Sequence, residues 1–540
     1  MPPSTSDTDC LIIGAGVAGA LLACGLARNG LRVTMLEAGP HIDRAKAVTQ
    51  YQHAMPKVPE CAYPLSDFTP HPVTHRIEDF YVQKGPDLFR STYLKQVGGT
   101  TWHWLGTSVR LVPDDFVLRS KFGLAVDWPF GYETLEPWYA AAERELGVSG
   151  NSADDLGSPR SGPYPLPQIP QSYLDLQWDA ALRGSSLKIS ATPQARLSQA
   201  QDNRPACCGS ASCIPICPVQ AKYDATVHTN RAVKLGVQIQ ANTVATRIES
   251  NADGRVTGVQ FRRTDGTSGQ ITARTVIVAA NAIETPRLLL ASASRYAPEG
   301  LANRSDQVGR NLMDHPIQLS WALADKPLWP YRGPGSTSGI ETLRTGSWRN
   351  ARSALRLEIG NDGWSWPTGA PDDTARRLAL SGLRGTALDR ALRDETSRHV
   401  RLAALTEQLP SADNRITLDP LLRDGSGLPR PVIHYRIDDY TRAGFEAARL
   451  QHEILFRQLG TTAVQHSDQA QGAGHILGTA RMGLDARTSV VDPDLRAHDH
   501  ANLYLVGAAT FPTGATANPT LTIAALALRA VDAITRNASR

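Results

Sequence analysis

Four of the seven cysteines in this chain of 540 residues lie in one short segment, CCGSASCIPICP at residues 207–218. The spacing is C-C-x4-C-x3-C, and the thiols belong to Cys207, Cys208, Cys213 and Cys217. Closely spaced thiolates in one loop are typical ligands of an iron–sulfur cluster. The pattern therefore favours such a cluster, with Cys213 and Cys217 among its ligands.

Two other uses of clustered thiols stay open. A structural zinc ion also takes four thiolates, although the paired C-x2-C knuckles that are usual for zinc are absent. Disulfides need an oxidising compartment, and the polar start MPPSTSDTDC shows neither a secretory signal nor a twin-arginine pair. Cys207 and Cys208 cannot easily both ligate one cluster, and the sequence does not decide which is spare. His71 and His75 offer no metal site, because Pro72 separates them.

A glycine-rich turn near the start of the chain predicts a dinucleotide site. Gly14, Gly16 and Gly19 form G-x-G-x-x-G between an expected strand at 10–13 and an expected helix at 18–28. Glycines there let the backbone turn tightly and approach a pyrophosphate at the N-terminus of the helix.

The neighbouring residues favour FAD as the dinucleotide. Glu37 ends the next expected strand, where a carboxylate accepts hydrogen bonds from ribose hydroxyls. The motif lies at the extreme N-terminus, and a second apolar strand, TVIVAA, ends in small residues at Ala279 and Ala280. Residues 10–27 are apolar enough to suggest a membrane span, but the glycines of the turn argue against one.

Charge and periodicity narrow the class of the chain further. The net charge of +4 is small for this length, which argues against binding to nucleic acid. NADG at 251–254 and TDGT at 264–267 are hairpin signals between strand-like runs. The arginine-rich stretch ALDRALRDETSRHVRLAAL at 387–405 indicates an exposed helix. No Gly/Ser linker divides the chain, so we expect two lobes built from interleaved segments.

Four stretches that span nearly the whole chain resemble the glucose–methanol–choline (GMC) oxidoreductase family. They are IIGAGVAGALLA at 12–23, QVGGTTWHW at 96–104, AANAIETPRLLLASAS at 279–294 and NPTLTIAALALRAVD at 518–532. Within the family, the cysteine loop, GRNLMDHP and HILGTARMG are most similar to the catalytic subunits of bacterial FAD-dependent glucose, fructose and sorbitol dehydrogenases. Residues 325–400 carry no motif that matches.

The resemblance implies an α/β fold, α+β overall, in which a Rossmann-like FAD-binding domain is interleaved with a substrate domain. The substrate domain would be built on an antiparallel sheet with helices. We expect the FAD-binding domain to comprise residues 1–104, 205–324 and 465–540, and the substrate domain to comprise residues 105–204 and 325–464.

The loop at 96–104 would lie against the flavin ring. The resemblance implies further cofactor contacts at Gly98, Gly99, Thr100, His103, Val244 and Ala280. Some members of the family tether the flavin covalently through a histidine at the position of His103. The alternative is a histidine that is wedged between Trp102 and Trp104 and bonded to a backbone carbonyl.

Oxidation of an alcohol needs a base for the hydroxyl proton while a cofactor takes the hydride, and neutral histidine suits that base near pH 7. The resemblance implies His475 as the base and Asn518 as the residue that holds the substrate oxygen. His475 could instead cap a loop, and Asn518 could cap the helix that begins at Pro519. We expect His315, in NLMDHP, to be structural or near the flavin.

The resemblance also implies partners. The resembling dehydrogenases carry a three-iron (3Fe-4S) cluster, which takes three thiolates and passes single electrons to a cytochrome. We therefore expect a sugar or polyol substrate, a small subunit that bears an export signal, and a multihaem cytochrome c subunit. The chain would be periplasmic and membrane-associated through its partner, or cytoplasmic if no partner exists. Ala473 and Gly474 stand where these enzymes have polar residues, which puts glucose in doubt and leaves room for glycosides or other sugars.

Two rival functions stay open. One is a flavin oxidase that passes electrons to oxygen and turns over without the thiolates. The other is a noncatalytic redox-sensing or assembly subunit, whose flavin would stay oxidised with every alcohol.

Overall fold

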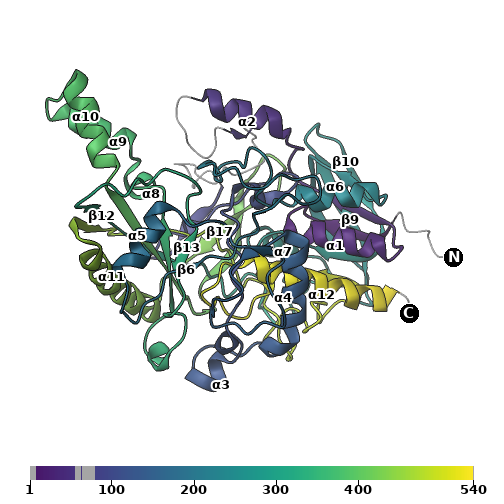
Figure 1. Cartoon of the computed structure of the whole chain (residues 1–540). Coiled ribbons are helices and arrows are strands. Elements are labelled where there is room, and N and C mark those ends of the chain that lie inside the picture. The colour runs from purple at the N-terminus through teal and green to yellow at the C-terminus, as the bar shows by residue number, and fades with distance from the viewer. Residues whose placement is uncertain (1–7, 55–61, 64–79, 539–540) are drawn as a thin grey trace.

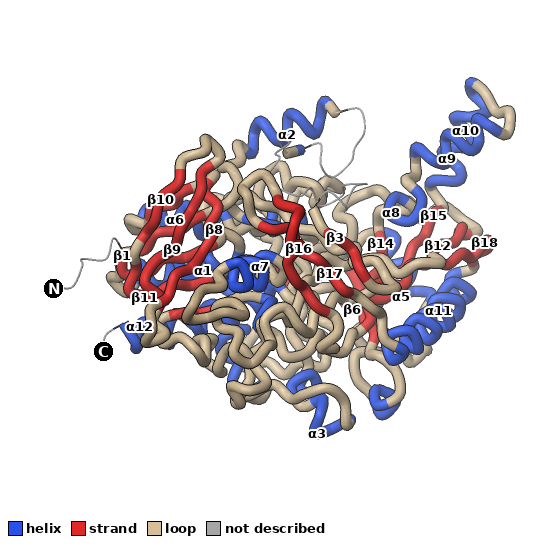
Figure 2. The backbone as a smooth tube through the Cα atoms, turned by 180° about the vertical axis from the view of Figure 1, so that it is seen from behind, coloured by secondary structure: helices blue, strands red, loops and turns tan. Residues whose placement is uncertain are grey.

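The chain folds around two main sheets that lie at opposite sides of the molecule (Figures 1 and 2). The computed structural model describes residues 8–54, 62–63 and 80–538. In Figure 1 the first sheet lies at the right with helices α1 and α12, and the second lies at the left with helix α11.

The first sheet is parallel, and its strands are short apolar runs in the order β19-β11-β1-β2-β7. They are β1 (Thr8–Ile13), β2 (Val33–Leu36), β7 (Gln238–Gln240), β11 (Ala273–Val278) and β19 (Leu503–Leu505). In the register of β1 with its two neighbours, Ile13 stands between Leu36 and Val278. Every residue of β2 is buried, as expected for a parallel sheet that is covered on both faces.

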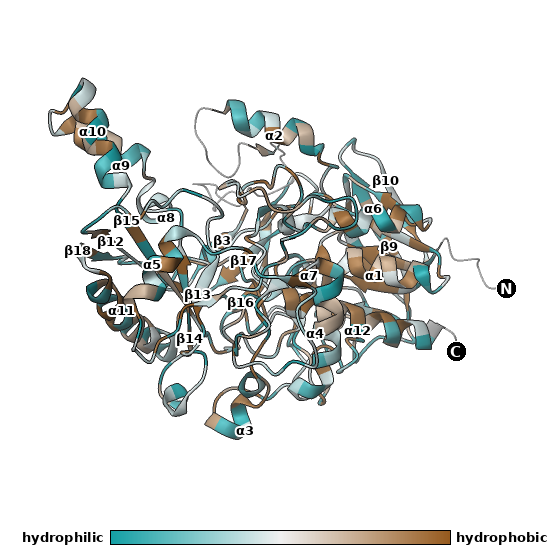
Figure 3. Ribbon diagram, viewed as in Figure 1, coloured by the Kyte–Doolittle hydropathy of each residue, from teal (hydrophilic) through white to brown (hydrophobic). Residues whose placement is uncertain are grey.

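Helices α1 (Val17–Arg28) and α12 (Thr520–Ala538) pack against each other and show broad apolar surfaces (Figure 3). Their contact is close, because a Cβ at Gly25 would lie 2.6 Å from a methyl group of Val531. The order strand, turn, helix, strand over residues 8–36 confirms the predicted Rossmann-like opening. No helix in the described part of the chain combines the length and the hydrophobicity that a bilayer span needs.

A three-stranded antiparallel sheet with the order β10-β9-β8 follows the first helices. Its strands are β8 (Thr243–Ser250), β9 (Val256–Arg263) and β10 (Ser268–Ile271), and helices α6 (Thr226–Lys234) and α7 (Glu284–Ala291) flank it in sequence. The turns at 251–254 and 264–267 join antiparallel neighbours, which confirms both hairpin predictions.

The second main sheet is antiparallel and has the order β18-β12-β15-β14-β13-β6. Its strands are β6 (Ser190–Ala191), β12 (Ile317–Ala324), β13 (Ser338–Ile340), β14 (Leu355–Gly360), β15 (His399–Thr406) and β18 (Thr461–His466). One face packs on α5 (Tyr173–Ala181) and α11 (Asp439–Leu459), where Trp178 and Phe456 join a buried apolar core. The other face carries Leu319 and Ala403, and Ala473 packs against it. An antiparallel sheet with helices is confirmed.

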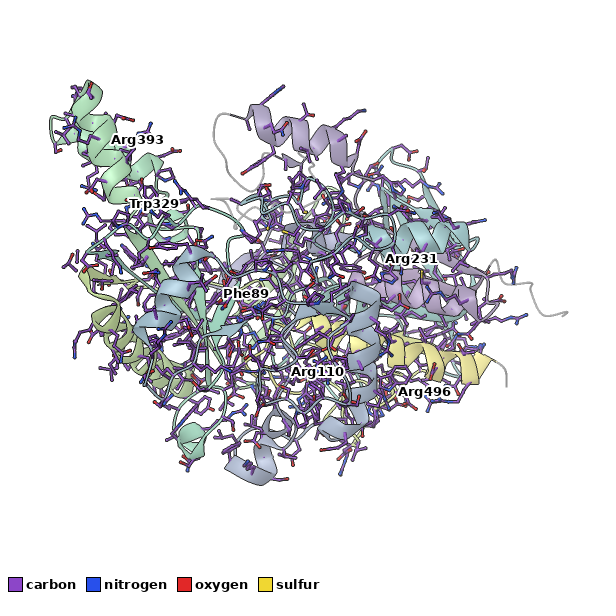
Figure 4. All side chains as sticks on the ribbon, in the orientation of Figure 1. Phe89, Arg110, Arg231, Trp329, Arg393 and Arg496 are labelled. Atoms are coloured by element: carbon purple, nitrogen blue, oxygen red, sulfur yellow. The ribbon has the colours of Figure 1, made fainter. Side chains whose placement is uncertain are left out.

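The remaining elements are short or lie at the surface. They are β3 (Val82–Lys84), β4 (Ser149–Gly150), β5 (Leu166–Pro167), β16 (Arg415–Arg423), β17 (Pro429–His434), α2 (Arg44–His53), α3 (Leu118–Phe122), α4 (Tyr132–Leu146), α8 (Ser365–Thr368), α9 (Asp372–Leu380) and α10 (Gly385–Thr396). Helices α9 and α10 project from the body, and Arg393 on α10 points outward in Figure 4, whereas Arg110 lies inside the body near α4.

The prediction of one exposed helix over 387–405 is wrong in its second half. α10 ends at Thr396, and β15 follows with all eight of its residues buried. The polar side chains of β15 have partners inside the protein: His399 stacks on Trp364 with ring centroids 3.9 Å apart, and Arg401 pairs with Asp362 at 2.7 Å.

The chain passes repeatedly between the two main sheets. The parallel sheet takes strands from 8–36, 238–278 and 503–505, and the antiparallel sheet takes strands from 190–191, 317–406 and 461–466. The segments are therefore interleaved, and the boundaries proposed above for the two domains stay a prediction.

Candidate active site

The predicted nucleotide turn has a backbone that only glycine accommodates at two of its three positions. Gly14 has φ of +106°, and a Cβ there would lie 2.7 Å from the carbonyl oxygen of Ala279. A Cβ at Gly19 would lie 2.0 Å from the carbonyl oxygen of Gly14. Gly16 differs, because a Cβ there would meet no atom within 4 Å. The N-terminus of α1 thus has an open side at Gly16, where a phosphate can approach the backbone.

Glu37 lies under this turn. Its carboxylate accepts hydrogen bonds from the backbone N–H groups of Ala15 at 2.8 Å and Gly39 at 3.0 Å. Burial raises the pKa of Glu37 to about 7, while those two donors act in the opposite direction. The backbone N–H of Thr243 bonds the Glu37 carbonyl at 2.8 Å, which brings the start of β8 and Val244 to the same place. Hydroxyl donors from a ribose would further stabilise the carboxylate.

The loop expected at the flavin meets the nucleotide turn directly. The N–H of Gly98 donates to the carbonyl of Ala15 at 3.0 Å, and a Cβ at Gly99 would lie 3.0 Å from the Cα of Gly16. Thr100 accepts a hydrogen bond from the N–H of Leu94 at 3.1 Å. The residues predicted to contact the cofactor therefore gather around one turn, with Ala280 beside Gly14 as well.

His103 ends the short 3-10 helix Gly99–His103 within this loop. Its ring lies 6.3 Å from that of Tyr63, and Trp102 beside it donates its indole N–H to Val97 at 2.9 Å. Covalent attachment of the flavin at His103 stays a prediction.

The two predicted catalytic residues come together with a third. Nε2 of His475 lies 3.2 Å from the side-chain nitrogen of Asn518. Nδ1 of His475 lies 2.8 Å from Nδ1 of His315, and the two rings meet edge to face at 82°. The ring of His475 thus contacts the two partners that fix its orientation, rather than only capping a loop.

The partners of His315 decide which nitrogens carry hydrogens. Nε2 of His315 lies 2.7 Å from the carbonyl oxygen of Ala515 and 3.0 Å from that of Gly514. Carbonyl oxygens only accept hydrogen bonds, so this Nε2 carries the hydrogen and Nδ1 of neutral His315 is an acceptor. His475 must then donate from its own Nδ1, which leaves the lone pair on its Nε2, where it accepts from the side-chain N–H of Asn518. This is the tautomer that a general base needs.

Both rings are neutral at pH 7. Burial lowers the pKa of His475 well below its ordinary value, and the charges of His315 and Arg356 act in the same direction. Burial also lowers the pKa of His315. The side-chain oxygen of Asn518 is buried and has no hydrogen-bond partner among the described residues, so it does not cap α12. It is available to a ligand.

Asp314 and Ser91 hold the backbone on which His315 and His475 lie, and neither residue was predicted from the sequence. One carboxylate oxygen of Asp314 accepts from the backbone N–H of His315 at 2.7 Å and of His475 at 3.1 Å. The hydroxyl of Ser91 donates to the other oxygen and accepts from the N–H of Gly474 at 2.8 Å. Burial raises the pKa of Asp314, and these donors oppose that shift. The only sequence signal was the position of Asp314 beside His315.

The cysteine loop separates its four thiols into two kinds. Cys213 and Cys217 are buried, Cys207 is partly buried, and Cys208 is exposed. Burial raises the pKa of Cys207, and the charges of Cys213 and Cys217 act in the same direction, so these three thiols are neighbours. The six described cysteines, which exclude Cys61, are all free thiols, and the disulfide alternative is not formed.

The metal alternatives can be compared on the same loop. Within the described residues, which do not include His71 and His75, no group of three or more His, Cys, Asp or Glu side chains is arranged to hold a metal ion. This finding counts equally against a zinc ion and against an iron–sulfur cluster in the loop, and the cluster stays a prediction.

The surroundings of the three thiols suit an anionic group. The backbone N–H of Gly209 donates to the sulfur of Cys207 at 3.4 Å, and that of Lys222 donates to the sulfur of Cys217 at 3.5 Å. Arg196 is buried beside them and has two side-chain N–H groups without a hydrogen-bond partner in the described part of the chain. Such orphaned donors fit a negatively charged cluster.

Fold and site together define the class of an FAD-binding oxidoreductase with a Rossmann-like turn and a pair of contacting histidines. Two sequence models described as GMC oxidoreductase match residues 185–317 and 410–527, and a model of a NAD(P)-binding Rossmann-like domain matches residues 12–91. The chain belongs to the GMC oxidoreductase family, as the resemblance predicted.

Named relatives extend over the whole chain. The fructose dehydrogenase large subunit of Gluconobacter japonicus is 38% identical over 551 residues, which cover 99% of each chain. The 2-methyl-1,2-propanediol dehydrogenase of Mycolicibacterium austroafricanum is 28% identical over 100% of this chain and 97% of its own. The crystal structure of pyridoxine 4-oxidase from Mesorbium loti matches with a TM-score of 0.65 at 18% identity, over 98% of this chain and 99% of that one. This last match concerns the fold alone.

Proposed function

We propose that the chain is an FAD-dependent dehydrogenase that oxidises a hydroxyl group of a sugar or polyol. The observation that carries the proposal is the row His315–His475–Asn518, in which Nε2 of His475 carries the lone pair and accepts a hydrogen bond from the side-chain N–H of Asn518. The similarity to the fructose dehydrogenase large subunit supports a sugar-like substrate.

Alcohol oxidation needs a hydride acceptor, a base and a hydrogen-bond donor for the substrate oxygen, and the site offers a residue for each of the last two roles. FAD, when bound, would supply the acceptor for the hydride that leaves the substrate carbon. Nε2 of His475 takes the hydroxyl proton, while its Nδ1–H stays bonded to His315. One amide N–H of Asn518 is bonded to Nε2 of His475, and the other would donate to the substrate oxygen as negative charge develops there. The unpartnered oxygen of Asn518 suits a neighbouring hydroxyl, which a polyol offers and a simple alcohol lacks.

We further propose that Cys207, Cys213 and Cys217 hold a 3Fe-4S cluster, and that the exposed Cys208 is the spare cysteine. The spacing of the loop, the mutual proximity of the three thiols and the orphaned donors of Arg196 support this assignment. Two electrons would then leave singly to a multihaem cytochrome c subunit, and a small subunit would export the chain to the periplasm. The relative is a large subunit, which supports partners of this kind.

The test is anaerobic bleaching of the flavin by a panel of sugars and polyols, with iron and FAD measured on the same purified protein. We expect bleaching by at least one polyol and iron bound together with FAD. Turnover that yields peroxide in a protein without iron would favour the oxidase, and a flavin that stays oxidised throughout would favour the noncatalytic subunit.

A further inference from the structure

Two buried cations lie between the flavin-facing loop and the cysteine loop. Arg196 and Lys222 are each 1% exposed. The ammonium of Lys222 donates to the carbonyls of Trp102 at 2.9 Å and Trp104 at 2.6 Å, on either side of His103. Arg196 donates to the next carbonyl, that of Leu105, at 3.0 Å. Lys222 thus binds the backbone of the loop at 96–104, and Arg196 binds the residue that directly follows it.

The same two cations also face the thiols. The charge of Arg196 acts on the thiol of Cys207, and the charges of Cys213 and Cys217 act on Lys222. The backbone N–H of Lys222 donates to the sulfur of Cys217. Lys222 therefore connects the two loops through its side chain and its backbone, and Arg196 connects them through its bond to Leu105 and its charge near Cys207.

Neither cation has an anionic partner that explains its burial. In the described residues neither forms an ion pair with a carboxylate, and the nearest acidic side chain that acts on Lys222, Asp224, is bonded to Arg44. Nε and Nη1 of Arg196 have no hydrogen-bond partner among the described side chains and backbone. The ammonium of Lys222 is bonded to uncharged carbonyls, and Arg196 keeps two N–H groups without a partner in the described residues, so an anion beside them would stabilise both charges.

We propose that Arg196 and Lys222 are positioning residues for the charge of the iron–sulfur cluster, and that they raise its reduction potential. The inference depends on the cluster assigned under the proposed function. Reduction adds one negative charge, and two fixed positive charges in a dry environment stabilise the reduced form. The electrons balance: the two taken from the substrate C–H bond leave in two single-electron steps to the external cytochrome, and the protons go to solvent.

The experiment is a potentiometric titration of purified holoprotein followed by low-temperature electron paramagnetic resonance. The variants are Arg196→Met and Lys222→Met, which remove charge, with Arg196→Lys and Lys222→Arg, which keep it. We expect a lower midpoint potential in each methionine variant and a potential close to the wild type in the partner variant. Iron per FAD is measured on every sample.

Arg204 provides the matched control. It is a buried arginine in the same region whose guanidinium is bonded to the carbonyls of Gln220 at 3.0 Å and Ala221 at 3.1 Å, and the charges that act on it most are those of Asp224 and Tyr223 rather than of the cysteines. Arg204→Met should leave the midpoint potential unchanged.

Each outcome decides the inference. Loss of iron from a methionine variant, with iron retained in the charge-keeping partner, supports it as well. Unchanged potentials in both methionine variants, or equal loss of iron from both members of a pair, would overturn it. Wild-type protein without iron would instead refute the cluster itself, which distinguishes failure of the proposed function from failure of this inference.

Discussion

At the scale of single residues, the orientation of the proposed catalytic histidine depends on two backbone carbonyls, which accept hydrogen bonds at any pH. The carbonyls of Gly514 and Ala515 fix the hydrogen on Nε2 of His315, and His315 in turn orients the ring of His475. The motifs identified His475 and Asn518 from sequence because both lie in distinctive loops. His315 and His475 are in contact but lie 160 residues apart in the sequence, so no local sequence pattern predicts that they form a pair.

His315→Phe should lower the rate of flavin reduction by about 10²- to 10⁴-fold, because His475 loses the acceptor that selects its tautomer. His315→Gln keeps an acceptor for His475 and a donor for the carbonyls, and it should recover part of the rate. Anaerobic stopped-flow measurement with a saturating substrate checks both variants. Equal rates in the two variants would show that His315 only fills space.

The pH dependence follows from the lowered pKa of His475. A base works when it is deprotonated, so activity is lost as the pH falls through its pKa. Because burial holds that pKa well below the ordinary value of 6.5, kcat/KM should stay level as the pH falls past 6.5. A profile of kcat/KM from pH 8 to the acid limit of stability measures this. An acidic limb centred at or above 6.5 would contradict the assigned environment of His475.

At the scale of elements, the N-terminus of α1 shows why its glycines could be predicted. Tight turns and close backbone approaches are local requirements, and Gly14 and Gly19 meet both. The stretch at 387–405 could not be divided correctly, because the polar residues of β15 resemble a solvated helix face. His399 and Arg401 of β15 are buried against Trp364 and Asp362, which belong to another segment, so the structure is needed to show their burial.

Gly16→Ala separates cofactor binding from folding. Gly16 has φ of −75°, which any residue adopts, and its Cβ would enter open space. The methyl group would occupy the approach of the pyrophosphate, so we expect FAD affinity to fall at least about tenfold, or about 1.4 kcal/mol, with the fold intact. Fluorescence titration of apoprotein with FAD measures the affinity, and circular dichroism checks the fold. Gly19→Ala, whose Cβ would lie 2.0 Å from a carbonyl oxygen, should instead damage the fold.

At the scale of the whole molecule, interleaved segments bring distant residues to one centre. Arg196 and Lys222 could not be chosen from the sequence among 56 lysines and arginines, because only the folded structure shows that they are buried without carboxylate partners.

Buried neutral histidines are a second feature of the whole molecule. His452, bonded to Ser320 at 2.7 Å, has its pKa lowered to about 3 by burial first and by the charges of His466 and Arg401 next.

This histidine should destabilise the fold in acid. The pKa of His452 is lower in the folded state than the ordinary 6.5, so its contribution to stability is complete above 6.5 and declines as the pH falls toward 3. At pH 5 the loss relative to pH 7 should be about 2 kcal/mol. Urea unfolding at the two pH values measures it. His452→Gln should show a smaller acid loss than the wild type, and an equal loss would contradict the shift.

The central claim is that Nε2 of His475 removes the hydroxyl proton of the substrate. The most direct measurement is the rate of anaerobic flavin bleaching by a saturating polyol in wild type and in His475→Ala, with the FAD content of both proteins verified. The account predicts a rate at least about 10²-fold lower in the variant at unchanged FAD content. Bleaching at the wild-type rate by a His475→Ala protein with a full complement of FAD would contradict it.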